Sequence, residues 1–398
     1  MSMIALDAAR EILAEAVAPL KPAAVPLPAA LGLRAVDPLR ADIDLPQGDV
    51  SAMDGYAARW EDLSAGEPLP CLLEICPGTS PPPLSPLTVA RIFTGAALPA
   101  GADTVIPQES ATVLEDGRVR LEKEAKGSYV RRRGEIVRRG EALVPQGAVL
   151  VPGSIALLAA FGHEEVRAIP RPRIAVVLTG GELLAPGAPP AAGSIHDSNG
   201  PMLAALAAQA RFPLAATLRA DDELDATRSV LEAAACQADL VVTSGGVSVG
   251  DHDFVPLAIR KMGGEVLFHR VAIRPGGPVL AARLGTSYLV GLPGNPLSAL
   301  VCWRLFAGPL GRALSGDLQA LREQPAVGTA RARLRNETDR TLLIPAAADF
   351  GASPPGIIPL PWKGSHDLVS AARADALVRI EANSECPEGG TASFYPLP

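Results

Sequence analysis

Strands and helices alternate along residues 173–314, and this alternation constrains the fold more than any other feature of the chain. The sequence predicts apolar strands at 174–178, 215–218, 240–243 and 288–290. It predicts helices at 202–210, 221–235, 254–261 and 297–310, together with an extended stretch at 266–273. Such alternation is typical of a doubly wound, mostly parallel α/β sheet.

Loops rich in glycine, proline or small polar residues follow the predicted strands. They cover residues 179–183, 244–251, 274–278 and 291–296. Because ligands of open α/β sheets bind beyond the carboxyl ends of the strands, we expect these loops to share one pocket. Glycines in the loop at 244–251 would let backbone N–H groups approach an anion, and Asp251 at its far end would hold a cation or order the loop.

The flanking sequence has a different pattern. Residues 46–135 alternate short β patterns with turns, which predicts a small β domain. Residues from about 325 to the end predict a second β module without a convincing helix. The first twenty residues predict an amphipathic helix with Leu6, Leu13, Val17 and Leu20 on one face. The expected fold class is therefore a multi-domain α/β protein with two additional β modules.

The composition narrows the classes of function. The chain has 398 residues, of which 48% are hydrophobic and 20% charged, and this predicts about two to four folded domains. A net charge of −7 argues against nucleic acid or an anionic membrane as the main partner. Five cysteines without a CxxC pair favour reduced thiols and argue against a zinc site. Since no signal peptide or membrane-spanning run is visible, the expected location is the cytoplasm.

An ordered set of short motifs spans nearly the whole chain. It consists of SAMDGYA at 51–57, RIFTGA at 91–96, GADTV at 101–105, SGGVSVG at 244–250, GLPGNP at 291–296 and GSHDL at 364–368. Together these motifs resemble those of the molybdopterin molybdenumtransferase family, which comprises the MoeA proteins and the E domain of gephyrin.

The resemblance implies a protomer of four parts. Residues 1–45 and 136–168 would form a linking domain, and residues 46–135 an inserted β domain. Residues 169–320 would form the α/β domain that binds molybdopterin, and residues 321–398 a C-terminal β domain. The resemblance also implies a homodimer whose active site combines the α/β domain of one chain with the inserted domain of the other.

The activity that the resemblance implies is insertion of molybdenum from molybdate into adenylylated molybdopterin, with release of AMP and a requirement for Mg²⁺. The residue types suit this chemistry. Backbone N–H groups bind a pyrophosphate, cationic and hydroxyl donors bind molybdate, and carboxylates bind Mg²⁺. Molybdopterin adenylyltransferase and the molybdoenzymes that receive the cofactor are the protein partners implied.

Roles for individual residues follow from the same resemblance. Catalytic roles are implied for Asp54, Thr94 and Asp251, and metal ligation for Asp54, Asp251 and Glu182. Cofactor binding is implied for Ser244, Gly245, Gly246, Ser248, Pro293, Gly294, Asn295, Arg274, Ser365 and Arg132. Structural alternatives stay open, because Asp54, Thr94, Asn295 and Ser365 are also common turn or cap residues and Arg132 belongs to a charge run.

Three positions depart from the family pattern. Ile136 and Gly181 stand where the family usually carries Asp, and Gly277 stands where it carries Lys. These departures predict weak molybdate binding and fewer ligands for Mg²⁺, unless Glu135 and Glu182 substitute. The alternative function is therefore a catalytically weak or inactive paralogue that binds molybdopterin or its molybdenum form as carrier, chaperone or regulator. A protein that keeps only the ligand preference of the α/β domain is disfavoured by the long N-terminal part and the C-terminal module.

Overall fold

A computed structural model describes residues 3–63, 66–248 and 253–397. The chain divides into two compact units. Unit 1 combines Met1–Ala23 with Ile169–Pro398, and unit 2 comprises Ala24–Ala168. No helix among the described residues is long and apolar enough to cross a lipid bilayer.

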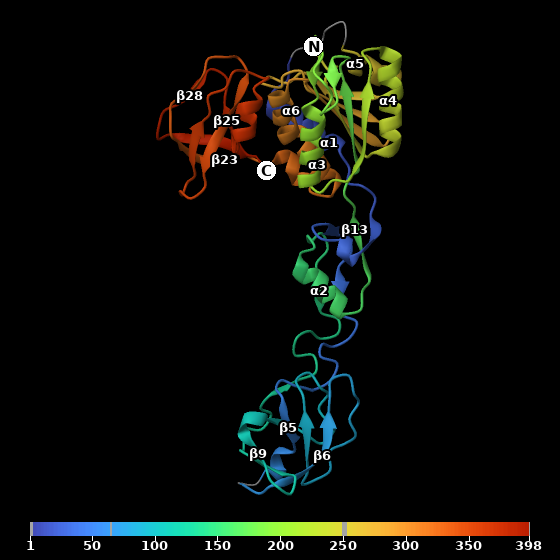
Figure 1. Cartoon of the computed structure of the whole chain (residues 1–398), viewed down its shortest axis with the longest axis vertical. Helices are drawn as coiled ribbons and strands as arrows, with labels where there is room; N and C mark the ends of the chain where they lie inside the picture. Colours follow the sequence, from blue (N-terminus) through green and yellow to red (C-terminus); the bar gives the residue numbers. More distant parts are fainter. Residues whose placement is uncertain (1–2, 64–65, 249–252, 398) are drawn as a thin grey trace. The chain divides into compact units, whose positions relative to one another are not determined.

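A six-stranded sheet forms the centre of unit 1 (Figure 1). Across the sheet the strands are β17 (Leu214–Ala220), β14 (Ile174–Thr179), β18 (Leu240–Ser244), β22 (Ser287–Leu292), β21 (Leu280–Leu284) and β19 (Glu265–His269). The first four pair in parallel, whereas β21 pairs antiparallel with both β22 and β19. The doubly wound, mostly parallel sheet predicted from the sequence is confirmed.

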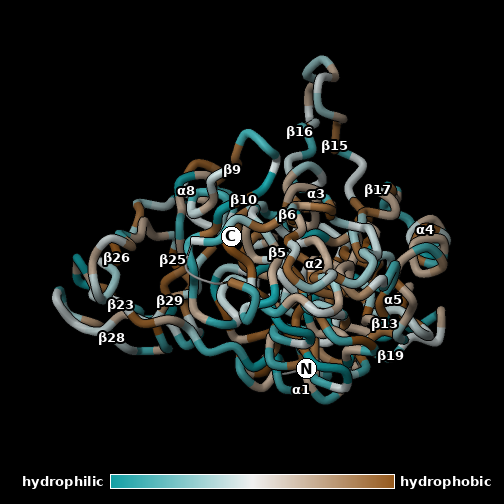
Figure 2. Tube along the Cα trace, turned by 90° about the horizontal axis from the view of Figure 1, so that it is seen from below, coloured by the Kyte–Doolittle hydropathy of each residue, from teal (hydrophilic) through white to brown (hydrophobic). Residues whose placement is uncertain are grey.

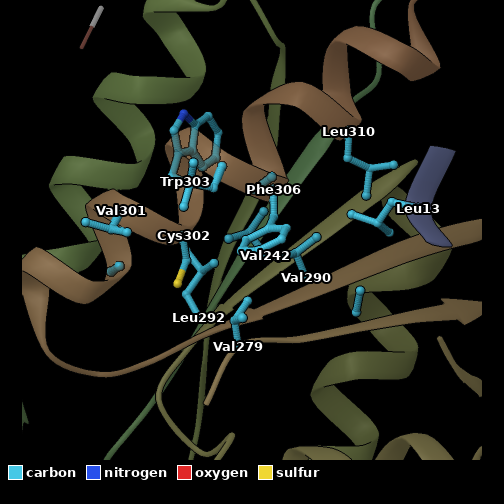
Figure 3. Close-up of a cluster of buried hydrophobic side chains, with 14 of the residues drawn as sticks. Leu13, Val242, Val279, Val290, Leu292, Val301, Cys302, Trp303, Phe306 and Leu310 are labelled. Carbon is cyan, nitrogen blue, oxygen red and sulfur yellow. The ribbon is translucent and has the colours of Figure 1, made fainter. Parts of the chain in front are cut away.

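Helices cover both faces of this sheet, because successive side chains of a strand point to opposite sides. One face carries α1 (Leu6–Ala16), α3 (Asn199–Gln209), α6 (Pro296–Cys302) and α7 (Gly308–Leu314). The other carries α4 (Leu224–Gln237) and α5 (Val255–Lys261). Figure 3 shows the core of the first face, where Phe306 lies against Val242 and Val290 of the sheet.

Several local features of unit 1 were not anticipated. A π-helical turn at Trp303–Ala307 separates α6 from α7, so the single helix predicted at 297–310 is a composite. The 3₁₀ helix η5 spans Leu318–Arg322. A short parallel pair, β15 (Leu183–Leu184) and β16 (Ile195–His196), belongs to a segment that extends beyond α3 and β17 in Figure 2.

The C-terminal module of unit 1 is a closed β structure. Its ring consists of β25 (Thr341–Asp349), β26 (Gly356–Pro359), β23 (Ala326–Ala330), β29 (Thr391–Pro396) and β27 (Ala376–Ile380), which pairs back to β25. β24 (Leu334–Asn336) pairs with β28 (Ser384–Cys386). The expectation that this module lacks a helix was wrong, because it contains α8 (Leu368–Arg373). Asp367 caps this helix by accepting hydrogen bonds from two backbone N–H groups.

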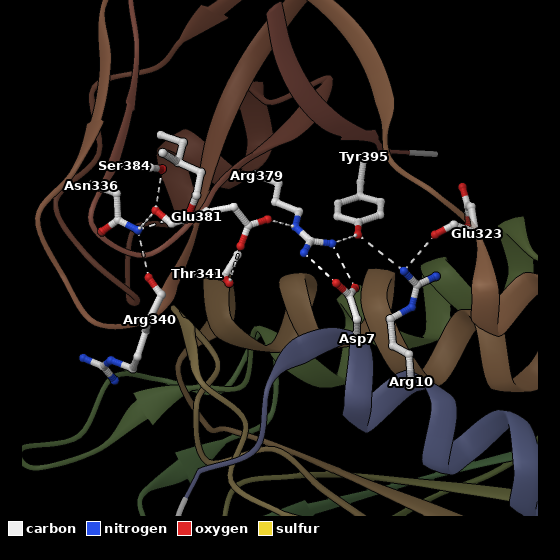
Figure 4. Close-up of polar contacts among 11 residues, drawn as sticks. Asp7, Arg10, Glu323, Asn336, Arg340, Thr341, Arg379, Glu381, Ser384 and Tyr395 are labelled. Atoms are coloured by element: carbon white, nitrogen blue, oxygen red, sulfur yellow. Dashed lines mark hydrogen bonds and ion pairs between the residues drawn. The ribbon is translucent and has the colours of Figure 1, made fainter.

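Polar contacts fasten α1 to the C-terminal module (Figure 4). Asp7 accepts two hydrogen bonds from the Arg379 guanidinium, at 2.9 and 2.7 Å. The same guanidinium donates to the hydroxyl of Tyr395 and to Glu381, and Arg10 also donates to Tyr395. The Arg379 partner holds the pKa of Asp7 below its usual range. Residues 1–23 are thereby part of unit 1, whereas the sequence expectation grouped residues 1–45 with 136–168.

Unit 2 contains a mixed sheet and a smaller helical part. The sheet runs β8 (Thr104–Pro107), β5 (Gly55–Ala58), β7 (Val89–Ile92), β6 (Leu69–Ile75), β10 (Arg118–Leu121) and β9 (Ala111–Val113). The remaining strands form three groups: β4 (Val50–Ser51) with β11 (Val130–Arg131), β3 (Leu39–Arg40) with β12 (Ala142–Val144), and β1 (Ala23–Pro26) with β13 (Glu165–Ile169) and β2 (Arg34–Ala35). Helix α2 (Pro152–Ala160) and the short 3₁₀ helices Leu27–Ala29, Trp60–Asp62 and Gln108–Ser110 complete the unit.

Candidate active site

The loops at the carboxyl ends of the parallel strands are tied together by one asparagine. Asn199, at the start of α3, donates through Nδ2 to the hydroxyl of Ser244 and to the carbonyl of Gly294, both at 2.7 Å. The loop after β18 is thereby fixed against the loop after β22. The site residues predicted from the sequence did not include Asn199. Ser244 is buried, so its hydroxyl braces the loop, and Gly294 is exposed beside it.

The two glycines of the next loop are required by close backbone packing. Gly245 and Gly246 have φ angles of +92° and +66°. A Cβ atom at Gly245 would lie 2.5 Å from Thr179 Oγ1 and 3.0 Å from the Thr179 carbonyl oxygen. The glycines therefore serve the approach of β14 to β18, whether or not an anion binds beside them.

A cavity of about 350 Å³ lies where two of the predicted loops meet the C-terminal module. Among its lining residues are four that the sequence assigned to the cofactor: Arg274, Pro293, Asn295 and Ser365. Asn295 Nδ2 donates to Ser365 Oγ at 2.9 Å, and the N–H of Leu297 donates to the Ser365 carbonyl at 3.1 Å. The α/β domain and the C-terminal module thus contribute side chains to one cavity.

Arg340 is a cavity residue that sequence reasoning missed. Strand β20 (Ile273–Arg274) pairs in parallel with β25, and this register sets Ile273 opposite Thr341. The pairing brings Arg340 to the loop at 274–278. Asn336 clamps the turn that carries Arg340, because Asn336 Nδ2 donates to the Arg340 carbonyl at 2.8 Å (Figure 4). Only the fold of the C-terminal module could have indicated this residue.

The electrostatic character of the cavity is cationic. Its described lining contains Arg274 and Arg340 and no carboxylate. A Cβ atom placed at Gly277 would lie 3.7 Å from Arg340 Nη1. Positive charge is therefore present beside position 277, although the residue there is glycine. A small tetrahedral dianion suits a cavity of this size, charge and donor set.

The other predicted residues of unit 1 lie outside this cavity. Ser248 lines a neighbouring cavity of about 90 Å³ with Arg270 and Arg340. Glu182 is exposed in the turn after β14, where the N–H of Gly181 donates to Asp222 Oδ2 at 3.0 Å. Asp251 lies outside the described residues.

Asp54 and Thr94 form a pair in unit 2. Both the N–H and the hydroxyl of Thr94 donate to Asp54 Oδ1, each at 2.8 Å. These two hydrogen bonds hold the pKa of Asp54 below its usual range, with a smaller contribution from the charge of Arg91. Both side chains are exposed, so the ionised carboxylate keeps Oδ2 accessible.

Arg132 is engaged by acidic neighbours. Its guanidinium donates to Asp49 Oδ2 at 2.6 Å, and its N–H donates to Glu135 Oε2 at 2.7 Å. Burial raises the pKa of Asp49, but hydrogen bonds from Arg133 and Arg132 lower it below its usual range overall. The arginine run is thus an ordered turn whose charges are partly neutralised.

Comparisons with known proteins cover almost the whole chain. Residues 4–162 match the model of the MoeA N-terminal region (domain I and II), residues 175–312 that of a probable molybdopterin binding domain, and residues 327–397 that of the MoeA C-terminal region (domain IV). The chain belongs to the MoeA family. The motif resemblance seen in the sequence is thereby confirmed.

Individual MoeA-family relatives agree with this assignment. Molybdopterin molybdenumtransferase 2 of Mycobacterium tuberculosis is 37% identical over 311 residues, which cover 75% of this chain and 77% of the relative. Molybdopterin molybdenumtransferase of Staphylococcus aureus is 32% identical over 350 residues, which cover 86% and 83%. The solved molybdopterin biosynthesis MoeA protein of Pyrococcus horikoshii superposes with a TM-score of 0.78 at 28% identity, over 99% of both chains.

The MoeA-family departures can be examined in the structure. Within residues 3–63, 66–248 and 253–397, no group of three or more His, Cys, Asp or Glu side chains is arranged to hold a metal ion. Gly181 offers only a backbone N–H, which Asp222 already accepts, and Ile136 is an exposed apolar side chain. At positions 136 and 181 the chain therefore offers no carboxylate to Mg²⁺.

Proposed function

We propose that this MoeA-family chain inserts molybdenum from molybdate into adenylylated molybdopterin and releases AMP. The observation that carries the proposal is the cavity with two arginines and, among its described lining, no carboxylate. Molybdate is a dianion of four oxygens, and guanidinium groups donate paired hydrogen bonds to such an oxyanion.

The chemistry requires two anionic groups to meet. The two dithiolene thiols of the pterin substrate form two Mo–S bonds as two Mo–O bonds of molybdate break. The two oxygens leave as water, taking two protons from the thiols and two from solvent, and the oxidation state of molybdenum does not change. Arg274 and Arg340 would offset the repulsion between the sulfurs and the oxyanion, because both residues line the cavity. Asn295 orients Ser365, whose hydroxyl would donate to a remaining oxygen of molybdate.

The phosphate end of the substrate would lie at the neighbouring strand ends. Gly245, Gly246, Ser248, Pro293 and Gly294 follow β18 and β22 there. The substrate's pyrophosphate would accept from the backbone N–H groups of Gly246, Ser248 and Gly294, because proline has no N–H and the Gly245 N–H donates to the Leu292 carbonyl. Ser244 would act indirectly, by holding Asn199 and hence the Gly294 loop. Hydrolysis of the pyrophosphate link, in which a water oxygen bonds to phosphorus as the bridging P–O bond breaks, releases AMP and leaves the other phosphate on the pterin substrate.

Asp54 and Thr94 are proposed to act in catalysis as a carboxylate and its orienting partner, with Arg132 as an additional cation. The homodimer, the cytoplasmic location and the adenylyltransferase and molybdoenzyme partners stay predictions from the sequence. A requirement for Mg²⁺ also stays a prediction, and no step is derived through the ion because no group of three or more His, Cys, Asp or Glu side chains among the described residues is arranged to hold it. The relatives named as transferases favour the enzyme over the carrier or regulator alternative.

A turnover experiment tests the proposal. The purified chain is incubated with adenylylated molybdopterin at increasing molybdate, and AMP and pterin-bound molybdenum are quantified. We expect molybdate-dependent AMP release, and a molybdate requirement roughly ten- to a hundredfold higher for Arg274→Ala. Arg283→Ala is the matched control, since Arg283 is an exposed arginine paired with Glu265 on the same unit. Pterin binding without molybdate-dependent AMP release by the wild type would favour the carrier alternative.

A further inference from the structure

A second cavity adjoins the cationic one. It has a volume of about 320 Å³ and shares two lining residues, Arg274 and Trp362, with the first. Its own lining includes Arg335, Glu337 and Leu342 of the C-terminal module. The same arginine and the same indole therefore border both spaces, an arrangement that suits one molecule with a part in each.

The second cavity combines an aromatic surface with a paired charge. Trp362 supplies the aromatic group, and Leu342 adds an apolar side chain. Glu337 Oε1 lies 2.7 Å from Arg335 Nη2, and both side chains are mostly exposed to solvent. The remaining carboxylate oxygen of Glu337 is available to accept hydrogen bonds from a ligand. These features suit a flat heteroaromatic ring with adjacent N–H donors.

The walls of the second cavity are held in place by the fold. Trp362 packs against the core of the α/β part and also against the core of the C-terminal module. Asn336 is buried and donates through Nδ2 to the carbonyls of Arg340, Ile380 and Glu381, while its Oδ1 accepts from the N–H and the hydroxyl of Thr338. The turn that carries both Glu337 and Arg340 is therefore fixed before a ligand arrives.

The strand-end loops, the cationic cavity and the second cavity follow one another in the same order as the chemical groups of the substrate. In molybdopterin the dithiolene lies between the pterin ring and the phosphate. The strand-end loops adjoin the cationic cavity through Pro293 and Asn295, and the second cavity adjoins it through Arg274 and Trp362. If molybdate and the dithiolene occupy the cationic cavity and the phosphate lies at the strand ends, the pterin ring lies on the side of the second cavity.

We propose that the second cavity binds the pterin ring of the substrate. Trp362 stacks on the ring, and Glu337 accepts hydrogen bonds from the ring N–H and the 2-amino group. This inference rests on the proposed function, because it takes its substrate from there. It adds a specificity site in the C-terminal module that the sequence motifs did not indicate.

Binding measurements separate this inference from catalysis. Metal-free adenylylated molybdopterin is equilibrated anaerobically with the full chain in ultrafiltration cells, and the bound fraction is measured without turnover. We expect Glu337→Gln to weaken binding about tenfold. Glu385→Gln is the matched control, because Glu385 is also a carboxylate paired with an arginine at 2.6 Å in this module and does not line the second cavity. It should bind as the wild type does.

The indole is tested by a pair of variants. Trp362→Leu should weaken binding about tenfold, and Trp362→Phe should restore most of the affinity because it retains a stacking face. AMP alone, measured in the same cells, should bind equally to all variants. Unchanged affinity for the pterin nucleotide in both Glu337→Gln and Trp362→Leu would overturn the inference, as would an equal loss of AMP affinity, which would assign the cavity to adenine. Binding without AMP release in the wild type would contradict the proposed function alone.

Discussion

Arg340 supplies positive charge next to Gly277, the position at which the motif resemblance implied a lysine. The distance from Arg340 Nη1 to a Cβ atom built at Gly277 is 3.7 Å. A cation from the C-terminal module therefore lies beside position 277. The expectation of weak molybdate binding stays a prediction from the sequence, and the cavity lining shows that Arg274 and Arg340 are the arginines present there.

Gly277→Lys tests this view at the residue scale. A lysine there would meet the Ile273 carbonyl oxygen at 3.3 Å from its Cβ and would crowd a second cation against Arg340. We expect molybdate affinity to stay the same or fall, measured by calorimetric titration. Gly277→Ala separates the steric effect from the charge. A tenfold gain for the lysine variant alone would show that the cavity does lack a cation.

Asp54 makes a second residue-scale prediction, which concerns pH. Because the N–H and hydroxyl of Thr94 lower the pKa of Asp54, the carboxylate stays ionised as pH falls below the range of an ordinary aspartate. A stability or activity that needs the ionised Asp54 carboxylate is therefore fully present above the pKa of an ordinary aspartate. It is lost only when the pH falls through the lowered pKa of Asp54. Thr94→Val removes one donor, so the acidic limb should move to higher pH.

Carboxyl NMR titration of Asp54 measures this shift directly. Thr79→Val is the control, because Thr79 is an exposed threonine of the same unit that donates to the Cys76 carbonyl. It should leave the titration of Asp54 unchanged. An unaltered midpoint in Thr94→Val would mean that the hydroxyl does not stabilise the carboxylate.

At the scale of elements, the strand-to-loop pattern predicted much of the α/β sheet but not its contacts with the C-terminal module. The apolar runs at 174–178 and 240–243 lie within β14 and β18, and the predicted loops lie at their carboxyl ends. The extended stretch at 266–273 instead divides into β19 and β20, which join different sheets. This division depends on pairing with β25, about seventy residues later in the chain, and local periodicity holds no information on such pairing.

The loop after β18 gives a prediction at this scale. The reference variant is at Gly285, which lies in the open turn between β21 and β22, has a φ of +60° and has no atom within 4 Å of a built Cβ. Gly285→Ala should lower the free energy of unfolding by about 1 kcal/mol, from backbone strain alone. Gly245→Ala should lower it by about 3 kcal/mol, since its Cβ also meets Thr179 at 2.5 Å. Urea denaturation compares the two variants. Equal losses would mean that packing against Thr179 adds nothing to the backbone strain.

At the scale of the whole molecule, each hydrophobic cluster lies within one of the two units. The described residues form three clusters in each unit. The motif resemblance suggested four parts, but it could not reveal that α1 packs in the core of unit 1, because that contact links residues such as Leu13 and Leu310 across most of the sequence. The amphipathic pattern of residues 1–20 predicted which face of α1 is apolar, but not which part of the chain that face packs against.

Excision tests the independence of unit 2. A fragment of residues 24–168 retains all three of its clusters, so we expect it to unfold cooperatively in a thermal melt followed by circular dichroism. Deleting residues 1–23 from the full chain should instead destabilise unit 1, because Leu6, Ala9 and Leu13 leave its core. A fragment without a cooperative transition would show that unit 2 needs the rest of the chain.

Equilibrium binding of molybdate to the full chain is the most direct test of the central claim that Arg274 and Arg340 form an oxyanion site. Calorimetry should give one molybdate per chain for the wild type, with affinity reduced roughly ten- to a hundredfold in Arg340→Ala. Arg333→Ala, which removes an exposed arginine paired with Glu385 in the same module, should bind as the wild type does. Wild-type affinity in Arg340→Ala, or an equal loss in Arg333→Ala, would contradict the account.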